Sequence, residues 1–324
     1  MSTVGMSDTF AVKVARKTCE ADGICSYELV SADGTPLPPF TAGAHIDVHV
    51  GDGIVRQYSL CNAPHETHRY LIGVLREPAS RGGSSAMHDR IAEGAEFQVS
   101  MPRNHFGLAD GPHHSVLFAG GIGITPLLAM AEHLHARGLP FTLHYSVRSA
   151  ARAAFRQRLE ATPFASCVRL HIDEEGTRLD VAAALPDCPP GTHLYVCGPA
   201  GYIDHVLATA RMLGWSDDRL HREYFGAAPV ANEEGERAFD VRVASTGCTY
   251  TVPPGRTVVQ VLADHGVDVP VSCEQGVCGT CLTRVLDGVP EHRDLYQTEE
   301  EQAANDQFTP CCSRAKSALL VLDL

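Results

Sequence analysis

The stretch SCEQGVCGTC, residues 272–281, places three cysteines within ten residues and a glycine between each successive pair. The spacing is Cys-x4-Cys-x2-Cys, and 29 further residues separate Cys281 from another cysteine, Cys311. Three thiols on one loop and a distant fourth are typical of a 2Fe–2S cluster, in which four thiolates hold two irons. The alternative is a zinc site, but zinc favours paired Cys-x2-Cys hooks and this segment has one. The segment therefore predicts an iron–sulfur centre.

The predicted cluster ligands are Cys273, Cys278, Cys281 and Cys311. Gly276 and Gly279 would let the backbone pass close to the inorganic sulfides with its amides turned towards them, and such hydrogen bonds tune the reduction potential. Cys312, next to Cys311, is the alternative fourth ligand. Six other cysteines are scattered, and we expect them to be structural: Cys19, Cys25, Cys61, Cys167, Cys188 and Cys248.

The composition excludes several classes of protein. The chain has 324 residues, 44% of them hydrophobic, and a formal net charge of −13. A nucleic-acid-binding protein needs a basic face, which this balance disfavours. No apolar run approaches the roughly 18 residues of a membrane span, and the start MSTVGMSDTF lacks the regions of a signal peptide. We expect a cytoplasmic protein, whose thiols stay reduced.

The order of strand and helix patterns predicts three domains. FTAGAHIDVHV and YLIGVL indicate strands of an antiparallel barrel, whereas HSVLFAGG followed by TPLLAMAEHLHARG indicates a strand and helix of a parallel α/β sheet. AAPVANEEGERA is polar and indicates a linker. The predicted order is a flavin-binding β-barrel domain (1–109), a nucleotide-binding α/β domain (110–228), the linker (229–238) and a plant-type 2Fe–2S β-grasp ferredoxin domain (239–324).

Two motifs in the first segment indicate a flavin site. RQYS resembles the flavin signature of the ferredoxin–NADP reductase superfamily, although the same four residues are also an ordinary strand sequence. The resemblance implies that Arg56 pairs with the flavin phosphate, that Tyr58 lies against the isoalloxazine ring, and that Ser59 hydrogen-bonds near N5. The second motif, RGGS, precedes a predicted helix whose N-terminal amides could bind phosphate. We predict FMN rather than FAD, because two arginines converge on a terminal phosphate and no extra segment is visible for an adenine. The motif residues are Arg56, Gln57, Tyr58, Ser59, Arg81, Gly82, Gly83 and Ser84.

Two motifs in the second segment indicate a nicotinamide site. GGIGITP joins a strand to a helix, and CGP ends a later strand, so both lie at carboxyl ends of strands, where open α/β sheets bind ligands. The first is not the Gly-x-Gly-x-x-Gly fingerprint of a standard dinucleotide site. Phe225 in REYFG could stack on the flavin, or it could be a hydrophobic plug at a domain junction. The predicted contacts are Gly120, Gly121, Gly123, Thr125, Pro126, Cys197, Gly198 and Pro199.

Together these motifs, which cover all three domains, resemble the family of phthalate dioxygenase reductase and vanillate demethylase reductase. The resemblance implies an enzyme that takes hydride from NADH onto FMN and passes electrons singly through the cluster to a Rieske-type terminal oxygenase. It favours Cys311 over Cys312 as fourth ligand. It also implies further flavin contacts at Gly73, Val74, Leu75 and Thr125, and catalytic roles for Ser59, Cys197 and Phe225. We expect a monomer that docks transiently on the oxygenase.

Two positions depart from the family pattern. Leu75 stands where the phthalate enzyme has a lysine, and Ser149 replaces an acidic residue that would favour NADH. Arg148 and Ser149 could accept a 2′-phosphate, so NADPH is the alternative to NADH. Two other functions compete with the reductase: a redox sensor that uses the cluster as a switch, and a zinc-stabilised adaptor without catalysis. The sensor lacks support, because the sequence shows no DNA-binding motif or basic patch.

Overall fold

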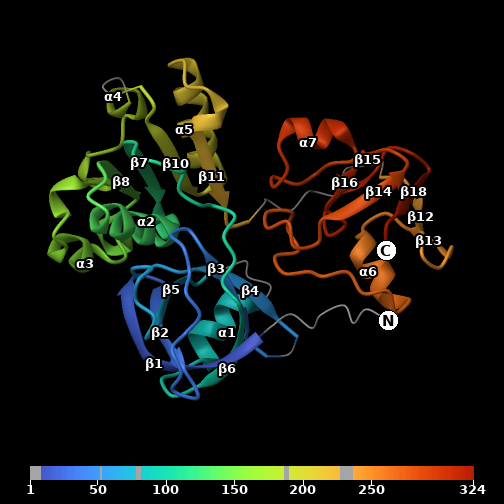
Figure 1. The fold of residues 1–324 in the computed structure, drawn as a ribbon, viewed down its shortest axis with the longest axis horizontal. Coiled ribbons are helices and arrows are strands. Elements are labelled where there is room, and N and C mark those ends of the chain that lie inside the picture. Colours follow the sequence, from blue (N-terminus) through green and yellow to red (C-terminus); the bar gives the residue numbers. More distant parts are fainter. Residues whose placement is uncertain (1–8, 52, 78–81, 186–189, 227–235) are drawn as a thin grey trace. The chain divides into compact units, whose positions relative to one another are not determined.

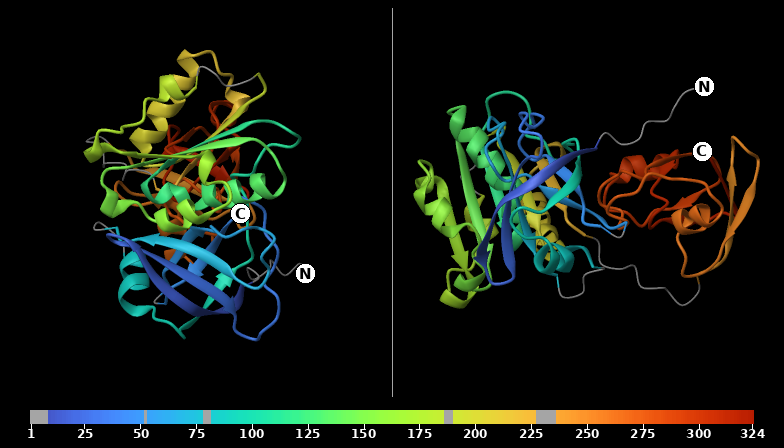
Figure 2. Two further views of the ribbon diagram at one scale, coloured as in Figure 1. Left: turned by 90° about the vertical axis from the view of Figure 1, so that its left-hand side faces the viewer. Right: turned by 90° about the horizontal axis from the view of Figure 1, so that it is seen from below.

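The computed structural model describes residues 9–51, 53–77, 82–185, 190–226 and 236–324. The chain forms two compact units, Met1–Glu223 and Tyr224–Leu324. Figures 1 and 2 show two sheets and their helices in the first unit and a smaller mixed fold in the second. No helix in the described part of the chain is both long and apolar enough to cross a membrane. Most of the predicted linker, residues 229–235, lies outside the described residues.

The first sheet of the first unit is a six-stranded antiparallel barrel in the order β4-β3-β6-β1-β2-β5. A bridge between Leu60 and Ile72 joins its two end strands. Buried side chains such as Val12, Tyr27 and Ile46 fill the interior, because alternate residues of each strand point inwards. Its elements are β1 (Thr9–Ala21), β2 (Ile24–Ser31), β3 (His45–His49), β4 (Val55–Ser59), β5 (Tyr70–Leu75), α1 (Gly83–Arg90) and β6 (Glu96–Ser100).

The second sheet has five strands in the order β11-β10-β7-β8-β9, and β10, β7, β8 and β9 run parallel. All six residues of β7 are buried, as expected for a central parallel strand. The chain builds outwards from β7 to β9 and then returns to β10, so the strand order reverses between β7 and β10. Open α/β sheets bind ligands at such a switch point. The strands are β7 (Ser115–Gly120), β8 (Phe141–Val147), β9 (Val168–Ile172), β10 (His193–Gly198) and β11 (Leu220–Tyr224).

Helix α2 (Ile124–Ala136) follows β7 after the short 3-10 helix Gly121–Gly123, and α5 (Ala200–Met212) follows β10. Helices α3 (Arg156–Ala161) and α4 (Val181–Ala184) are shorter. One hydrophobic cluster combines residues of both sheets: Ile24 and Phe106 from the barrel segment lie with Leu127 and Met130 from α2. Barrel and parallel sheet therefore share a core, which holds the ends of their strands in a fixed arrangement.

The second unit combines a mixed five-stranded sheet, in the order β13-β12-β18-β14-β16, with α6. β12 pairs with β18 in parallel and with β13 in antiparallel fashion. The unit has a second helix, α7 (Glu299–Ala304). Each helix begins with a capping box, Thr257 with Gln260 in α6 and Thr298 with Glu301 in α7. Its elements are β12 (Phe239–Val243), β13 (Thr249–Val252), α6 (Val258–Asp264), β14 (Thr283–Asp287), β15 (Pro290–Glu291), α7 (Glu299–Ala304), β16 (Gln307–Phe308), β17 (Arg314–Ala315) and β18 (Leu319–Leu322).

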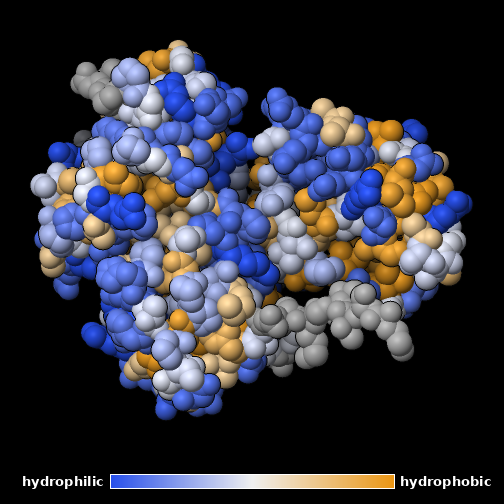
Figure 3. All heavy atoms as spheres, viewed as in Figure 1, coloured by the Kyte–Doolittle hydropathy of each residue, from blue (hydrophilic) through white to orange (hydrophobic). Residues whose placement is uncertain are grey.

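The surface in Figure 3 is mostly polar on the visible face of the first unit, with small apolar areas between the polar side chains. The second unit shows larger apolar areas, and its exposed large hydrophobic residues include Leu286, Val289 and Leu295. Exposed apolar residues among polar ones are normal for a protein surface, so these areas alone do not define a binding site.

Candidate functional site

The start of α1 has the features of a phosphate-binding site. Gly82 precedes the helix with φ 91°, a left-handed conformation that favours glycine. A Cβ atom at Gly83 would lie 2.4 Å from Cγ of Arg56, so the Arg56 side chain from β4 lies directly against the helix start. The first turn of α1, all of it within the described chain, carries no acidic side chain. The first amides of α1 and the Arg56 guanidinium, which also donates to the Val55 carbonyl at 2.7 Å, therefore lie together in an arrangement that suits an anion. Arg81 lies outside the described residues.

The rest of the RQYS motif runs along β4 towards the second sheet. Tyr58 is partly buried, and burial raises the pKa of its hydroxyl. The Gln57 amide nitrogen lies 3.2 Å from Nε2 of His45 on β3. Ser59 ends the strand and is buried. Along β4, the Tyr58 ring and then the Ser59 hydroxyl follow Arg56. A bound flavin would need its phosphate, its ring and its N5 atom to be met in this same order.

The predicted flavin strand, Gly73 to Leu75, meets the second sheet through Thr125. A Cβ atom at Gly73 would lie 2.8 Å from the Thr125 methyl carbon, so only a glycine lets α2 approach β5 this closely. The Thr125 hydroxyl donates to the Ile122 carbonyl at 3.0 Å. The Val74 side chain is buried, and Leu75 is partly buried at the strand end. The strand and the start of α2 therefore share one face of the candidate site.

The two predicted nicotinamide motifs touch each other through their backbones. A Cβ atom at Gly123 would lie 2.2 Å from the Cys197 carbonyl oxygen, and one at Gly198 would lie 3.0 Å from Cα of Gly120. Gly121 has φ 54°, again in the left-handed region. Pro126 lies in the first turn of α2, and Pro199 is the N-cap of α5. The motifs thus meet at the switch point between β7 and β10, with two helix starts beside them.

A carboxyl group that the sequence analysis missed completes this region. The Ser59 hydroxyl donates to Oε2 of Glu223, on β11, at 3.4 Å. Packing around the carboxyl raises the Glu223 pKa to about 8, although part of the residue remains accessible. Cys197 is fully buried, and burial, with a further contribution from the Glu223 charge, raises the pKa of its thiol. Ser59, Cys197 and Glu223 therefore form a group with protonated side chains at neutral pH. The sequence did contain a hint of this carboxyl group, because Glu223 belongs to the motif REYFG, two residues before Phe225.

Two predicted residues lie at the margins of these motifs. Arg148 follows β8 and is exposed, and its carbonyl accepts a hydrogen bond of 3.0 Å from the Glu174 amide. The acidic segment Asp173–Glu175 therefore lies beside Arg148. Phe225 directly follows β11, and 41% of its surface is exposed. The sequence alone did not reveal that this segment, which carries three acidic residues, lies beside Arg148.

The four predicted cluster ligands gather in the second unit. The exposed fractions of Cys273, Cys278, Cys281 and Cys311 are 9, 5, 3 and 5%. Hydrogen bonding with Cys278 and Cys311 lowers the pKa of Cys273, and hydrogen bonding with Cys273 and Cys281 raises the pKa of Cys311. The four thiols therefore form one buried group that joins the loop to the distant cysteine.

The loop around these thiols also fits a cluster. The Gln275 amide donates to Sγ of Cys273 at 3.3 Å. Gly276 and Gly279 have φ 71° and 70°, and Cβ atoms there would lie 2.4 Å from Sγ of Cys312 and 2.3 Å from the Tyr296 ring. Within the described ranges, no group of three or more His, Cys, Asp or Glu side chains is placed to hold a metal ion. A 2Fe–2S cluster, in contrast, needs four thiolates around two irons, and this donor set supplies them.

Cys312 hydrogen-bonds with its neighbour Cys311, but its other side-chain hydrogen bonds are with Thr309 and Ser313 rather than with cluster thiols. Its Sγ lies 3.2 Å from the Thr309 hydroxyl and 3.8 Å from the Ser313 hydroxyl. These polar contacts hold the Cys312 side chain close to Gly276 of the cysteine loop. The structure thus gives Cys311, but not Cys312, contacts with two of the predicted ligands.

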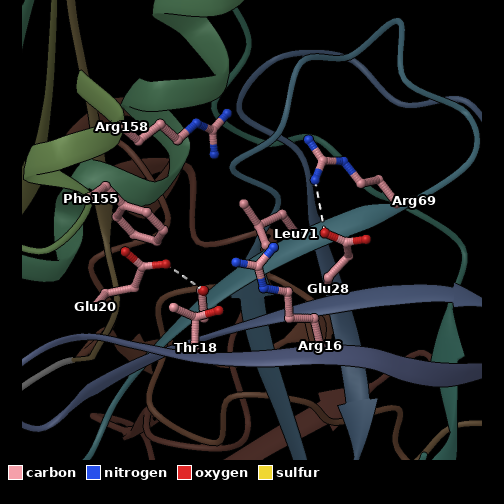
Figure 4. A pocket seen from close by; sticks show the side chains of 9 residues that line it. Arg16, Thr18, Glu20, Glu28, Arg69, Leu71, Phe155 and Arg158 are labelled. Atoms are coloured by element: carbon pink, nitrogen blue, oxygen red, sulfur yellow. Dashed lines mark hydrogen bonds and ion pairs between the residues drawn. The ribbon is translucent and has the colours of Figure 1, made fainter. Parts of the chain in front are cut away.

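A small polar pocket of about 210 Å³ lies between the β1–β2 hairpin and α3 (Figure 4). Most of its charged groups have partners. Arg69 pairs with Glu28 at 2.9 Å, Arg158 pairs with Glu132 at 3.1 Å, and Glu20 accepts a hydrogen bond of 2.6 Å from Ser26. The pocket contains none of the predicted site residues, so the functional site lies at the strand ends.

A barrel and a parallel sheet with glycine-rich helix starts, joined to a four-cysteine domain, define the class of iron–sulfur flavoprotein reductases. Residues 241–316 match the 2Fe-2S iron-sulfur cluster binding domain family, and residues 100–220 match the N-terminal domain of dimethylamine monooxygenase subunit DmmA-like proteins. The chain is 56% identical to a vanillate O-demethylase oxidoreductase of Pseudomonas putida, over 97% of this chain and 99% of the relative. It is 43% identical to the reductase subunit of phthalate 4,5-dioxygenase from Pseudomonas putida, over 100% and 99%.

Among solved structures, phthalate dioxygenase reductase matches with a TM-score of 0.77 and 40% identity, over 98% of both chains. The chain therefore belongs to the family of oxygenase reductases that includes vanillate O-demethylase oxidoreductase and phthalate dioxygenase reductase. The predicted fold, the enzyme class and the flavin, nicotinamide and 2Fe–2S cofactors are confirmed. The redox sensor and the zinc adaptor are not needed to explain any feature of the chain.

The cysteine assignment predicts different effects for two neighbouring substitutions. Cys311→Ser should lose most of the iron and the visible iron–sulfur absorbance, because it removes a thiol that contacts two other ligands. Cys312→Ser should keep both, since a serine hydroxyl can retain the hydrogen bond to Thr309. Iron content and absorbance of the two purified variants check this. Loss of the cluster in Cys312→Ser alone would make Cys312 the fourth ligand.

The raised pKa of Glu223 predicts a pH-dependent difference in stability. Its pKa is about 8 in the folded protein and 4.5 in the reference state, so folding favours the protonated acid. This contribution to stability is complete below pH 4.5 and is lost as the pH rises through about 8. Glu223→Gln mimics the protonated form at every pH. We expect wild type to lose stability relative to Glu223→Gln between pH 5 and pH 9, as measured by urea unfolding of both proteins. A difference that does not change with pH would refute the buried proton.

Proposed function

We propose that this chain is the reductase component of an aromatic O-demethylase of the vanillate type. It belongs to a family of oxygenase reductases, and two relatives named vanillate O-demethylase oxidoreductase are 56 and 57% identical to it over 97 and 94% of the chain. The observation that carries the proposed chemistry is the meeting of Ser59, Cys197 and Glu223 at the strand ends. When bound, FMN takes a hydride from NADH and releases the electrons singly to the 2Fe–2S cluster, from which the oxygenase receives them.

The residues of the chain bind and orient the groups that react. Arg56 and the amides of α1 hold the FMN phosphate, and Tyr58 offers its ring to the flavin. Glu223 retains its proton at pH 7, because its pKa is about 8. Together with the Ser59 hydroxyl it keeps a hydrogen-bond donor, rather than a negative charge, beside the hydride acceptor. The buried Cys197 thiol excludes water from the same place.

We assign FMN rather than FAD because the Arg56 side chain contacts the start of α1. Its side chain lies against Gly83, where a terminal phosphate would meet both the guanidinium and the helix amides. An FAD pyrophosphate would have to continue past this helix towards an adenine site. The cofactor released by heat denaturation identifies the flavin, because FMN and FAD separate readily by chromatography.

We assign NADH as the donor because an acidic segment lies beside the Arg148 backbone. Asp173, Glu174 and Glu175 follow β9, the strand beside β8, and the Glu174 amide bonds to the Arg148 carbonyl. A 2′-phosphate placed near Arg148 would meet these like charges. Ser149 cannot repel a 2′-phosphate as an acidic residue at that position would. We propose that the segment Asp173–Glu175 supplies this repulsion instead.

This assignment predicts that kcat/KM for NADH exceeds that for NADPH by at least about tenfold, which corresponds to roughly 1.4 kcal/mol. The triple variant Asp173→Asn, Glu174→Gln, Glu175→Gln should raise kcat/KM for NADPH and leave that for NADH nearly unchanged. Asp217→Asn, which removes an exposed carboxylate elsewhere in the first unit, is the control. Steady-state kinetics with ferricyanide measures both values. A wild-type preference for NADPH would reverse the assignment.

We propose the domain arrangement 1–109, 110–228, 229–238 and 239–324, with a monomer that docks transiently on its oxygenase. From Glu236 to Leu324 the sequence has 13 acidic and 7 basic residues. Glu299, Glu300 and Glu301 begin α7 and are exposed. Such a surface favours a basic patch on the partner, and attraction of this kind is screened over a Debye length of about 10 Å at 0.1 M salt.

Electron delivery should therefore slow as salt rises, whereas NADH oxidation with ferricyanide should change less. The double variant Glu299→Gln, Glu300→Gln should lower the rate with oxygenase at low salt by several-fold and reduce its salt dependence. The control Glu96→Gln, Asp110→Asn makes the same charge change on exposed residues of the first unit. Vanillate-dependent NADH consumption in the presence of a vanillate oxygenase measures the rate. Equal salt dependence in all three proteins would rule out docking through α7.

A further inference from the structure

Two cysteines outside the cluster face each other across the β1–β2 hairpin. Cys19 and Cys25 are direct partners in the antiparallel register, so their side chains point to the same face of the sheet. Directly opposite Cα atoms in such a pair are about 4.5 or 5.5 Å apart, depending on the hydrogen-bonding pattern. Both values lie within the roughly 4.4–6.8 Å that a disulfide requires. The register therefore places the two cysteines within the Cα separation of a disulfide.

The environments of the two thiols differ in a way that suits oxidation. Cys19 is exposed, whereas Cys25 is partly buried. Sγ of Cys25 lies 3.7 Å from Nδ1 of His88, on α1. Solvent oxidants can therefore reach Cys19 first, and Cys25 lies behind it with a basic group beside its sulfur.

The tautomer of His88 follows from its second contact. Nε2 of His88 lies 2.9 Å from the Val74 carbonyl oxygen, which can only accept a hydrogen bond. Nε2 must therefore carry the ring proton, and Nδ1 of the neutral imidazole is left as an acceptor facing Cys25. Val74 is also the register partner of Cys25 in β5, so the same strand holds the ring in place. His88 is thus oriented to accept the thiol proton.

We infer that Cys19 and Cys25 form a reversible disulfide when the protein meets hydrogen peroxide, with His88 positioning and deprotonating Cys25. The Cys19 thiol gives up its proton as its sulfur attacks the peroxide. The O–O bond breaks, a sulfenic acid forms, and the departing hydroxide takes up that proton as water. The Cys25 thiol then gives its proton to Nδ1 of His88 and attacks the Cys19 sulfur. The S–O bond breaks, the departing hydroxide takes the proton as water, and the S–S bond forms. Two thiols are oxidised and one peroxide is reduced to two waters.

Burial and the proximity of Cys19 raise the Cys25 pKa, so a base is needed to make this thiol a nucleophile near neutral pH. The inference does not depend on the proposed substrate or on the cofactor assignments. It does change the role of these cysteines, which the sequence analysis expected to be structural.

The test uses the intact holoenzyme, treated with a small excess of hydrogen peroxide, alkylated and digested with trypsin. Residues 18–56 lie between trypsin sites at Lys17 and Arg56 and contain Cys19 and Cys25 as their only cysteines. We expect this peptide to lose two hydrogens and to resist alkylation until a dithiol is added. Recovery of the peptide with both cysteines alkylated, or with Cys19 oxidised irreversibly and Cys25 free, would overturn the inference.

Three variants separate the roles. Cys25→Ser should stop the reaction at the Cys19 sulfenic acid, which dimedone labels. His88→Gln should slow disulfide formation about tenfold and let the same sulfenic acid accumulate, whereas a merely structural His88 would leave both unchanged. Cys248→Ser removes an exposed cysteine of the second unit and should change nothing. Disulfide formation at the wild-type rate in His88→Gln would exclude His88 as the proton acceptor.

Discussion

The Cys197 carbonyl oxygen occupies nearly the place that a Cβ atom at position 123 would need, 2.2 Å away, and the rest of the site depends on this contact. Because residue 123 is glycine, the loop after β7 can lie against the end of β10, and α2 can start there. That start brings Thr125 against Gly73, a second position where only glycine fits. The two glycines thus fix the distance between the ends of β7 and β10, where we propose that the nucleotide binds, and β5, which we propose contacts the flavin.

The shared core makes this distance rigid. Ile24 and Phe106 from the barrel segment pack with residues of α2 in one cluster, so the two sheets cannot move apart without exposing apolar surface. Ser59 at the end of β4 consequently stays within 3.4 Å of Glu223 on β11. Hydride transfer needs positioning more than acid–base chemistry, and a rigid joint between two sheets is a direct way to supply it.

The sequence predicted the cofactors because each depends on local spacing. The cysteine loop and the glycines around Gly123 carry their chemistry within a few residues. The structure added what comes from residues far apart in the chain: Glu223 against Ser59, Asp173–Glu175 beside Arg148, and Cys19 opposite Cys25. No periodicity or motif joins these residues, since register and sheet order bring them together. The single unit formed by the barrel and the parallel sheet likewise follows from packing between the sheets rather than from any local pattern.

The central claim is that electrons enter through the first unit and leave through the four-cysteine domain. A chain that ends before Glu236 keeps every proposed flavin and nucleotide contact and lacks every cluster ligand. The decisive measurement compares this shortened chain with the full chain in two assays, NADH oxidation with ferricyanide and NADH-dependent turnover by a vanillate oxygenase. The account predicts a yellow protein with near-normal ferricyanide activity and no oxygenase turnover. A shortened chain that drives the oxygenase at the full rate would show that the cluster is not on the electron path.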